Sequence, residues 1–153
     1  MGDQILDTWD VHNRINLYLL DAIGQGELTS QLSSKGRNVA EQFAHMHNVR
    51  LMWLQQAGPE LMEGLAKIEN EQAADNELLT KSLESSARAI RQLLGKAIES
   101  SKIKGFKGPA TTFLGYLISH ESHHRGQIVL ALKQSGHPLD KKVAYGIWEW
   151  GVR

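Results

Sequence analysis

Four segments of this sequence place apolar residues at steps of three and four, the spacing that gathers side chains on one face of an α-helix. The segments cover about residues 5–23, 39–57, 76–100 and 109–134. Alternation with a period of two, which would indicate β-strands, yields no convincing strand pair. Four long amphipathic segments in one small chain predict an all-α four-helix bundle, because each apolar face must be buried against another.

The stretches between these segments read as connections. Residues 24–38 are rich in Gly and Ser, and residues 101–108 form a basic stretch containing glycine. Both are long for an up-and-down bundle, so one or more crossovers are expected there. Residues 59–68 are expected to add a further helical turn or two. Pro109 is expected as the first residue of the fourth helix, where its missing N–H costs nothing, and the tail, residues 139–153, predicts a short additional C-terminal helix.

Length and composition restrict the class of protein. A chain of 153 residues suits one domain, so residues 1–153 are expected to form a single helical bundle. Seventeen basic residues balance 17 acidic ones, which favours neither nucleic acid nor an anionic membrane surface as partner. No apolar run approaches the roughly 20 residues that a membrane span needs, and the charged N-terminus lacks a signal core. The chain has no cysteine, so disulfides and thiolate metal sites are excluded. Taken together, these features predict a soluble cytoplasmic protein.

The segment "YLISHESHHRGQIVLAL", residues 116–132, contains the pattern H-E-x-x-H. Residues four apart lie on the same helix face, so His120 and His124 point the same way, on the stripe that also carries Phe113 and Leu117. Burying two imidazoles there without partners would be costly. A metal ion removes that cost, because neutral imidazole is a natural metal ligand. The alternative is that the pair hydrogen-bonds other core groups or is half exposed.

The second helix brings further histidines, in "VAEQFAHMHNVRLMW". His45 and His47 flank its apolar stripe on opposite sides, so position alone does not choose between them. Facing helices in a bundle lie within about 8–10 Å, so one of the two could join the pair on the fourth helix. Three histidines with an open fourth position form the arrangement of catalytic zinc sites. We interpret His123 as a surface or interface residue, and His12 and His137 as ordinary polar residues.

The same stretches resemble the DinB-like superfamily of metal-binding four-helix bundles, which includes the bacillithiol transferases and, more distantly, mycothiol-dependent maleylpyruvate isomerases. The resemblance rests on "FAHMHNVRLMWL" and "HESHHRGQI", and extends more loosely through "WDVHNRINLYLLDAI" and the terminal "IWEW". It implies a metal site made by His45, His120 and His124, a divalent ion such as zinc or nickel, and a bound water. It also implies a homodimer, to whose interface Trp148 and Trp150 could contribute.

The residues after His124 need physical roles of their own. Gln127 is a candidate to hydrogen-bond a ligand histidine, and His47 is a further candidate for contacts around the site. Arg125 is a further candidate for contacts around the site or with substrate, although an ion pair between helices is the favoured role. A glycine in mid-helix costs about 1 kcal/mol relative to Ala, which a close helix–helix approach at Gly126 would justify. Plain packing and solvation is the alternative for Arg125, Gly126 and Gln127.

The favoured function is that of a divalent-metal-binding protein of the DinB-like type, and the resemblance implies as its activity a metal-dependent thiol S-transferase that acts on a small-molecule electrophile. A low-molecular-weight thiol would have to be supplied, because the chain has no cysteine, and the metal would acidify it. The alternative is a non-catalytic metal-binding or stress-related bundle protein that binds a small ligand.

A zinc protease of the H-E-x-x-H type is the remote alternative, with Glu121 as general base. Such proteases bind an extended peptide along an exposed strand, and no strand is expected here. Glu121 lies one step round the helix from His120 and is expected to face solvent. His45 supplies a third ligand without recruiting Glu149, so we interpret the protease pattern as a coincidence.

Overall fold

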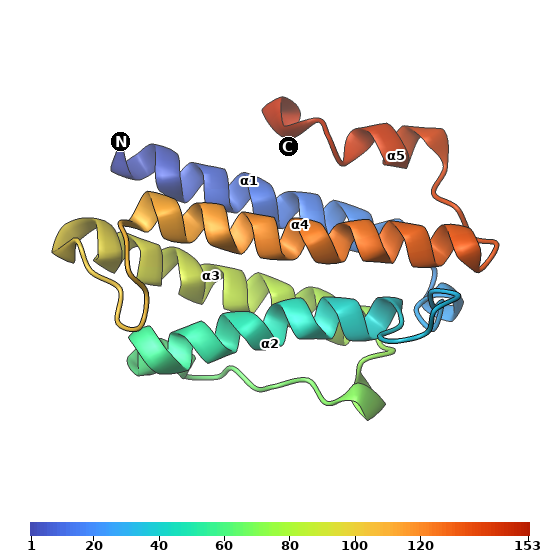
Figure 1. Ribbon diagram of the computed structural model, residues 1–153, viewed down its shortest axis with the longest axis horizontal. Coiled ribbons are helices and arrows are strands. Elements are labelled where there is room, and N and C mark those ends of the chain that lie inside the picture. The colour runs from blue at the N-terminus through green and yellow to red at the C-terminus, as the bar shows by residue number, and fades with distance from the viewer.

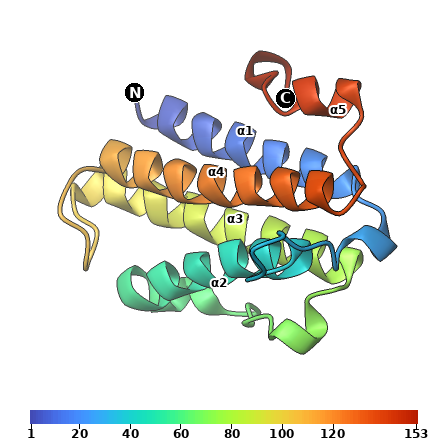
Figure 2. The same ribbon diagram turned by 45° about the vertical axis from the view of Figure 1, so that its right-hand side comes forward.

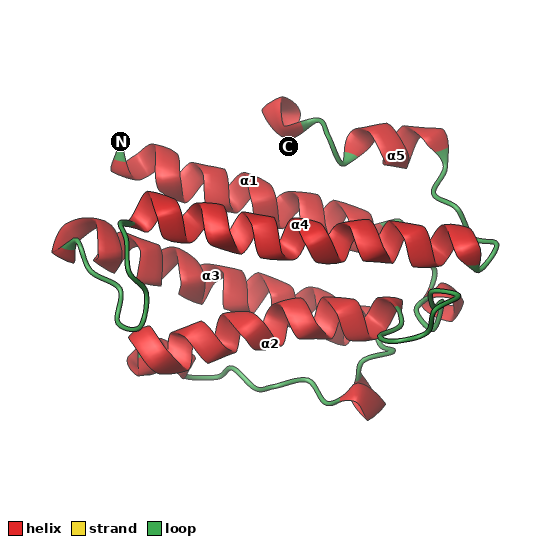
Figure 3. Ribbon diagram, in the orientation of Figure 1, coloured by secondary structure: helices red, strands yellow, loops and turns green.

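The computed structural model describes residues 1–153, and its regular elements are all helical (Figure 3). The four long helices are α1, Gly2–Asp21; α2, Val39–Ala57; α3, Asn76–Ser100; and α4, Ala110–Gln134. A short helix, α5, Lys141–Gly146, follows, and the 3₁₀ turn η4, Trp150–Val152, lies at the end of the chain. The prediction of an all-α four-helix bundle with an additional C-terminal helix is confirmed. None of the helices combines the length and the apolar character that a bilayer span requires.

Side chains just before the helices explain where the helices begin. Asn38 accepts a hydrogen bond from the N–H of Glu41, and the Glu41 carboxylate accepts one from the N–H of Asn38, which forms a capping box for α2. Asp75 caps α3 by accepting from the N–H of Leu78. The fourth helix begins one residue later than expected, because Pro109 has extended backbone angles and occupies the N-cap position.

The helices do not follow a simple up-and-down order (Figure 1, Figure 2). α1 and α4 run side by side in one direction, and α2 and α3 run side by side in the other. Because α2 and α3 are parallel, the connection between them, residues 58–75, has to return along the length of the bundle (Figure 1). It carries only two 3₁₀ turns, η2 (Pro59–Met62) and η3 (Asn70–Gln72). The crossover therefore lies in residues 58–75 and not at 24–38 or 101–108, where it was expected. The further helical turn expected in residues 59–68 is present as η2, but the chain after it is not helical.

The apolar core is divided into two halves by a layer of polar side chains. One half surrounds Phe43 and Met46, and the other surrounds Trp9 and Phe113. The buried polar side chains that we call the polar layer are His12, Asn13, Asn16, Arg50, Ser86, Glu121 and Arg125. Polar groups are stable in such a place only when they are hydrogen-bonded, so their partners help to fix how the four helices align.

The C-terminal segment, residues 139–153, packs on the outside of the bundle near α1 and α4 (Figure 1). Gly146 is buried so close to Tyr18 of α1 that an added Cβ would overlap the tyrosine ring. The guanidinium of Arg153 stacks on the same ring, 3.7 Å from its centroid. Trp150 lies against His12, with ring centroids 5.9 Å apart, so it packs within its own chain. Trp148, in contrast, is 78% exposed.

Candidate metal centre

Helices α2 and α4 pack against each other in opposite directions, and three histidines meet between them. His45 comes from α2, and His120 and His124 come from successive turns of α4. One ring nitrogen of each lies within 4.8 Å of the others. The Nε2 atoms of His120 and His124 are 3.2 Å apart. Two nitrogens at about 2.05 Å from a tetrahedral zinc ion lie about 3.3 Å apart, so the three histidines, here called the triad, could hold a metal ion.

Gln42 of α2 orients one imidazole of the triad. Its Oε1 lies 2.6 Å from Nδ1 of His124. Because an amide oxygen only accepts, Nδ1 carries the proton and donates it to Gln42. The lone pair of His124 Nε2 is then free and faces Nε2 of His120. Metal-bound imidazoles are commonly held in this way, so the donor set fits a metal ion.

The surroundings of the triad keep its imidazoles neutral. Burial, with the nearby charge of Arg37, lowers the pKa of His45 to about 4. Burial and the proximity of His120 lower the pKa of His124 to about 4. The pKa of His120 is also lowered, again chiefly by burial. A metal ion binds neutral imidazole, so the triad is in its ligand form at neutral pH.

Aromatic side chains adjoin the triad, and no pattern in the sequence predicted them. Tyr116, one turn before His120, stacks on that ring with centroids 6.4 Å apart. The Tyr116 hydroxyl accepts a hydrogen bond of 3.3 Å from Trp53 Nε1, and Phe106 lies edge-on to Trp53. We call Trp53, Phe106 and Tyr116 the aromatic shelf. The shelf adjoins the centre through Tyr116, and the charge of Arg37 acts on all three histidines.

His47 points away from the triad and does not contribute to it. It is buried, and its Nε2 donates to the carbonyl oxygen of Ala66 at 2.8 Å. The neighbouring Asn48 side chain binds both the N–H and the carbonyl of Ile68, each at 2.9 Å. Together the two residues fasten the returning connection to α2, which is a structural role. His123 is exposed, as expected of a surface residue.

Glu121 was expected to face solvent, and this expectation was wrong. Its carboxylate lies in the polar layer and accepts hydrogen bonds from Arg50 Nε at 2.8 Å and Arg50 Nη2 at 2.6 Å. It also accepts from Asn16 at 2.8 Å and from His12 at 3.0 Å. Burial alone would raise the pKa of Glu121, but the charge and hydrogen bonds of Arg50, with those of His12, lower it below its ordinary value. With both oxygens engaged in this way, Glu121 is not available as the base of a zinc protease.

His12 and Arg125 also belong to the polar layer. His12 was interpreted as an ordinary polar residue, but it is completely buried. Burial lowers its pKa, which favours a neutral ring that donates from Nε2 to Glu121 and accepts at Nδ1 from Arg125.

Arg125 was expected to make an ion pair between helices. It instead donates to the amide oxygen of Asn16 on α1 at 2.7 Å and to Ser122 at 2.9 Å, so it does link helices, but through a neutral partner.

Gln127 and Gly126 differ from their expected roles. The hydrogen bond to a triad histidine that was expected of Gln127 is made by Gln42. Gly126 is exposed on α4, and an added Cβ would meet no atom within 4 Å, so no close helix approach requires a glycine there.

Comparison with known families gives a match that spans the bundle. The DinB family matches residues 1–144, a range that contains all four long helices and the whole triad. No curated protein and no solved structure gives a significant match.

Proposed function

This chain belongs to the DinB family, and we propose on that premise that it binds one divalent metal ion, zinc or nickel, through the triad. The observation that carries the proposal is the convergence of three neutral imidazoles from two helices on one point. Imidazole nitrogen is a suitable ligand for both metals. The proton on His124 Nδ1, held by Gln42, leaves the ligand nitrogen free for the ion.

We further propose that the centre serves a thiol S-transferase acting on a small electrophile. Three protein ligands leave a position open, and an ion bound there would acidify a thiol or a water. The residues of the chain would position the reactants: the aromatic shelf would bind the apolar part of the electrophile, and Arg37 would attract an anionic group. The thiol must come from a small molecule, because the chain has no cysteine. Such thiols are kept reduced in the cytoplasm, where we place the protein.

A second candidate is a metal-binding protein without catalysis, and one observation favours it. The acidic side chain of the H-E-x-x-H pattern, Glu121, is engaged by Arg50, Asn16 and His12, so it supplies no proton acceptor to the centre. In this alternative the metal would stabilise the α2–α4 pair or recruit a small ligand.

Metal analysis of matched histidine variants tests the proposed centre. Purified protein should contain about one zinc or nickel per chain, measured by elemental analysis and by competition with a chelator. His45→Ala, His120→Ala and His124→Ala should each abolish tight binding. His47→Ala is the control on the same helix and should retain the metal, because that side chain binds Ala66. If His47→Ala removed the metal while His45→Ala kept it, the assignment of ligands would be wrong.

A screen of thiols against electrophiles separates the two candidates. If the protein is a transferase, the rate of thiol consumption should depend on the bound metal and should be lower in the His120→Ala variant. Activity should also fall when Tyr116 is replaced by Ala, with metal content unchanged, because the shelf positions substrate rather than metal. A metal-loaded protein that accelerates no such transfer would favour the non-catalytic alternative.

A further inference from the structure

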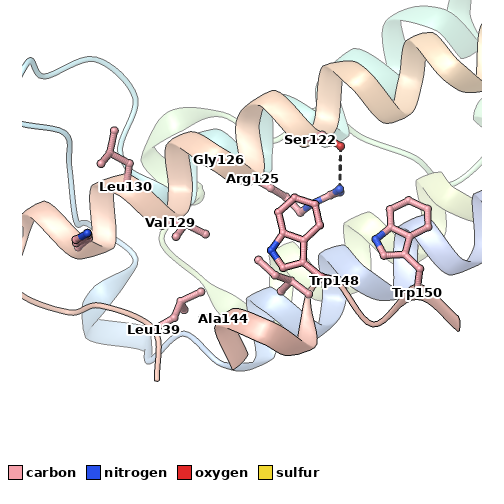
Figure 4. Close-up of a pocket in the computed structure, with 11 residues that line it drawn as sticks. Ser122, Arg125, Gly126, Val129, Leu130, Leu139, Ala144, Trp148 and Trp150 are labelled. Atoms are coloured by element: carbon pink, nitrogen blue, oxygen red, sulfur yellow. Dashed lines mark hydrogen bonds between the residues drawn. The ribbon is translucent and has the colours of Figure 1, made fainter. Parts of the chain in front are cut away.

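A cavity of about 560 Å³ lies between α4 and the C-terminal segment (Figure 4). Its volume is within the range of about 300–1,000 Å³ that is usual for small-molecule sites. Val129 of α4, Ile147 and the rings of Trp148 and Trp150 give it an apolar wall, and Figure 4 shows both indole rings beside α4. None of the triad residues lines the cavity, so it is a different site from the metal centre.

The roof of this cavity is held in place by specific contacts. Gly146 fits closely against the Tyr18 ring. The guanidinium of Arg153 stacks on the same ring, 3.7 Å from its centroid. Arg153 also donates to the carbonyl of Gly146 at 3.4 Å. Trp150 packs against His12. The cavity is therefore preformed, and a ligand would not have to order the segment in order to bind.

The floor of the cavity explains a glycine that helix packing does not. Gly126 lines the cavity in the middle of α4, where glycine costs about 1 kcal/mol relative to Ala. No neighbouring atom lies within 4 Å of the Cβ it lacks. A side chain at this position would begin at the wall of the cavity, where its Cβ meets no protein atom, so the absence of one keeps the space open.

The charges of the lining have one sign. Arg125 and Lys133 line the cavity, and no acidic side chain does. The guanidinium of Arg125 is nearly buried and is fixed by Asn16 and Ser122 through its two terminal nitrogens. Its Nε makes no hydrogen bond to the protein and remains a donor for a ligand. A buried cation at the end of an apolar space is complementary to an anion that carries an apolar body.

We propose that this cavity binds a small carboxylic acid with an aliphatic or aromatic body. The carboxylate is held by Arg125, and the body lies over Gly126 between Val129 and the ring of Trp148. The 78% exposure of Trp148 is consistent with an aromatic wall that a ligand would cover. The site does not depend on the metal centre, because the triad faces α2 and the cavity faces the C-terminal segment.

Octanoate is a suitable probe. Its binding to the full chain can be measured by calorimetry and by the change in tryptophan fluorescence. Octanoate should bind saturably with one site per chain, and 1-octanol, which lacks the charge, should bind at least about tenfold more weakly. Gly126→Leu should weaken octanoate binding at least about tenfold while leaving zinc affinity unchanged. This variant should fold, because its Cβ meets no protein atom within 4 Å and leucine favours a helix.

Gly115→Leu is the matched control, because Gly115 is another exposed glycine of α4 with no atom within 4 Å of an added Cβ, outside the cavity. It should bind octanoate like the unmodified chain. Trp148→Ala, which removes an exposed side chain, should weaken binding as well. The proposal is overturned if the unmodified chain shows no saturable binding up to millimolar octanoate. It is also overturned if Gly126→Leu binds octanoate normally, if 1-octanol binds equally well, or if Gly126→Leu changes the molecular mass in solution, which would make this face a subunit interface.

Discussion

At the scale of single residues, Glu121 shows how strongly the centre of the bundle depends on one charge. Its carboxylate is 1% exposed and faces Arg50, which is itself completely buried. Removing one member of a buried ion pair costs about 3–5 kcal/mol, because the other charge is left without its partner. Glu121→Gln should therefore lower the free energy of unfolding by about 3 kcal/mol, measured by urea denaturation.

An exposed ion pair provides the control for that measurement. Glu77 pairs with Lys81 one turn along α3, and both side chains are largely exposed. Glu77→Gln should leave the free energy of unfolding almost unchanged, since surface pairs contribute little. A similar small change for Glu121→Gln would show that the polar layer is not what holds the four helices together.

The lowered pKa values of the triad predict how zinc affinity depends on pH. If all three histidines had the ordinary pKa of 6.5, zinc affinity well below that pH would fall by about a thousandfold per pH unit, because three protons compete with the ion. The pKa values of His45 and His124 are lowered to about 4. Between about pH 6 and pH 5 these two stay neutral, so the fall should be about tenfold per unit or less. Chelator competition across this range measures the slope, and a fall on the order of several hundredfold, which three histidines of ordinary pKa would give here, would contradict the lowered values.

The contrast between His124 and Glu121 shows what can be predicted from sequence at this scale. The spacing of His120 and His124 is local, and helix geometry alone places both on one side. The orientation of Glu121 depends on Arg50, which is 71 positions away in the sequence. A charged residue without a visible partner is expected to face water, so Glu121 was left off the buried face of α4, although Phe113 and Leu117, which were placed on that face, are buried. Gln42 was missed for the same reason, because its partner His124 is 82 positions away.

At the scale of elements, the long helices were predictable because their signals are local. The third segment was expected at about residues 76–100, and α3 begins and ends there. Asp75 caps its N-terminus, and the helix carries a continuous apolar stripe. The path of the chain between helices was not predictable in this way. Residues 59–68 have helix-compatible composition, but only residues 59–62 form a 3₁₀ turn, and residues 65–68 are not helical and are held against α2 by His47 and Asn48. Those anchors depend on the packed bundle, so a single segment does not reveal them.

The docking of the C-terminal segment gives a prediction for that element. Gly146→Val should force Tyr18 away from its position and loosen residues 139–153, because even a Cβ overlaps the tyrosine ring. Hydrogen exchange of this segment should become faster, while α2 and α3 remain protected. Gly151→Val is the control, since a Cβ there meets no atom within 4 Å. Equal exchange in both variants would mean that the Gly146–Tyr18 contact does not hold the segment.

At the scale of the whole molecule, α4 connects every site through its helical rotation of about 100° per residue. His120 and His124 face α2 and form the triad with His45. Glu121 and Arg125 enter the polar layer, and Gly126 lies under the C-terminal segment. The proposed metal centre and the proposed carboxylate site therefore lie on different sides of one helix, separated by buried hydrogen bonds. This arrangement allows either site to be altered while the other is measured.

The last prediction concerns assembly, for which we expect a homodimer. Tyr145 and Val152 on the C-terminal segment are apolar side chains that are 65% and 75% exposed. The net charge of the chain is zero, so charge repulsion does not prevent two copies from associating. In a two-fold interface each residue occurs twice, so a charge introduced there is repeated across the interface. Light scattering at micromolar concentration should give twice the 17.1 kDa of one chain. The double change Tyr145→Glu and Val152→Glu should shift the mass to the monomer, whereas Met52→Glu, at a 55% exposed apolar residue of α2, should not. A monomer in the unmodified chain would contradict the prediction, and a dimer that survives the double change would place the interface elsewhere.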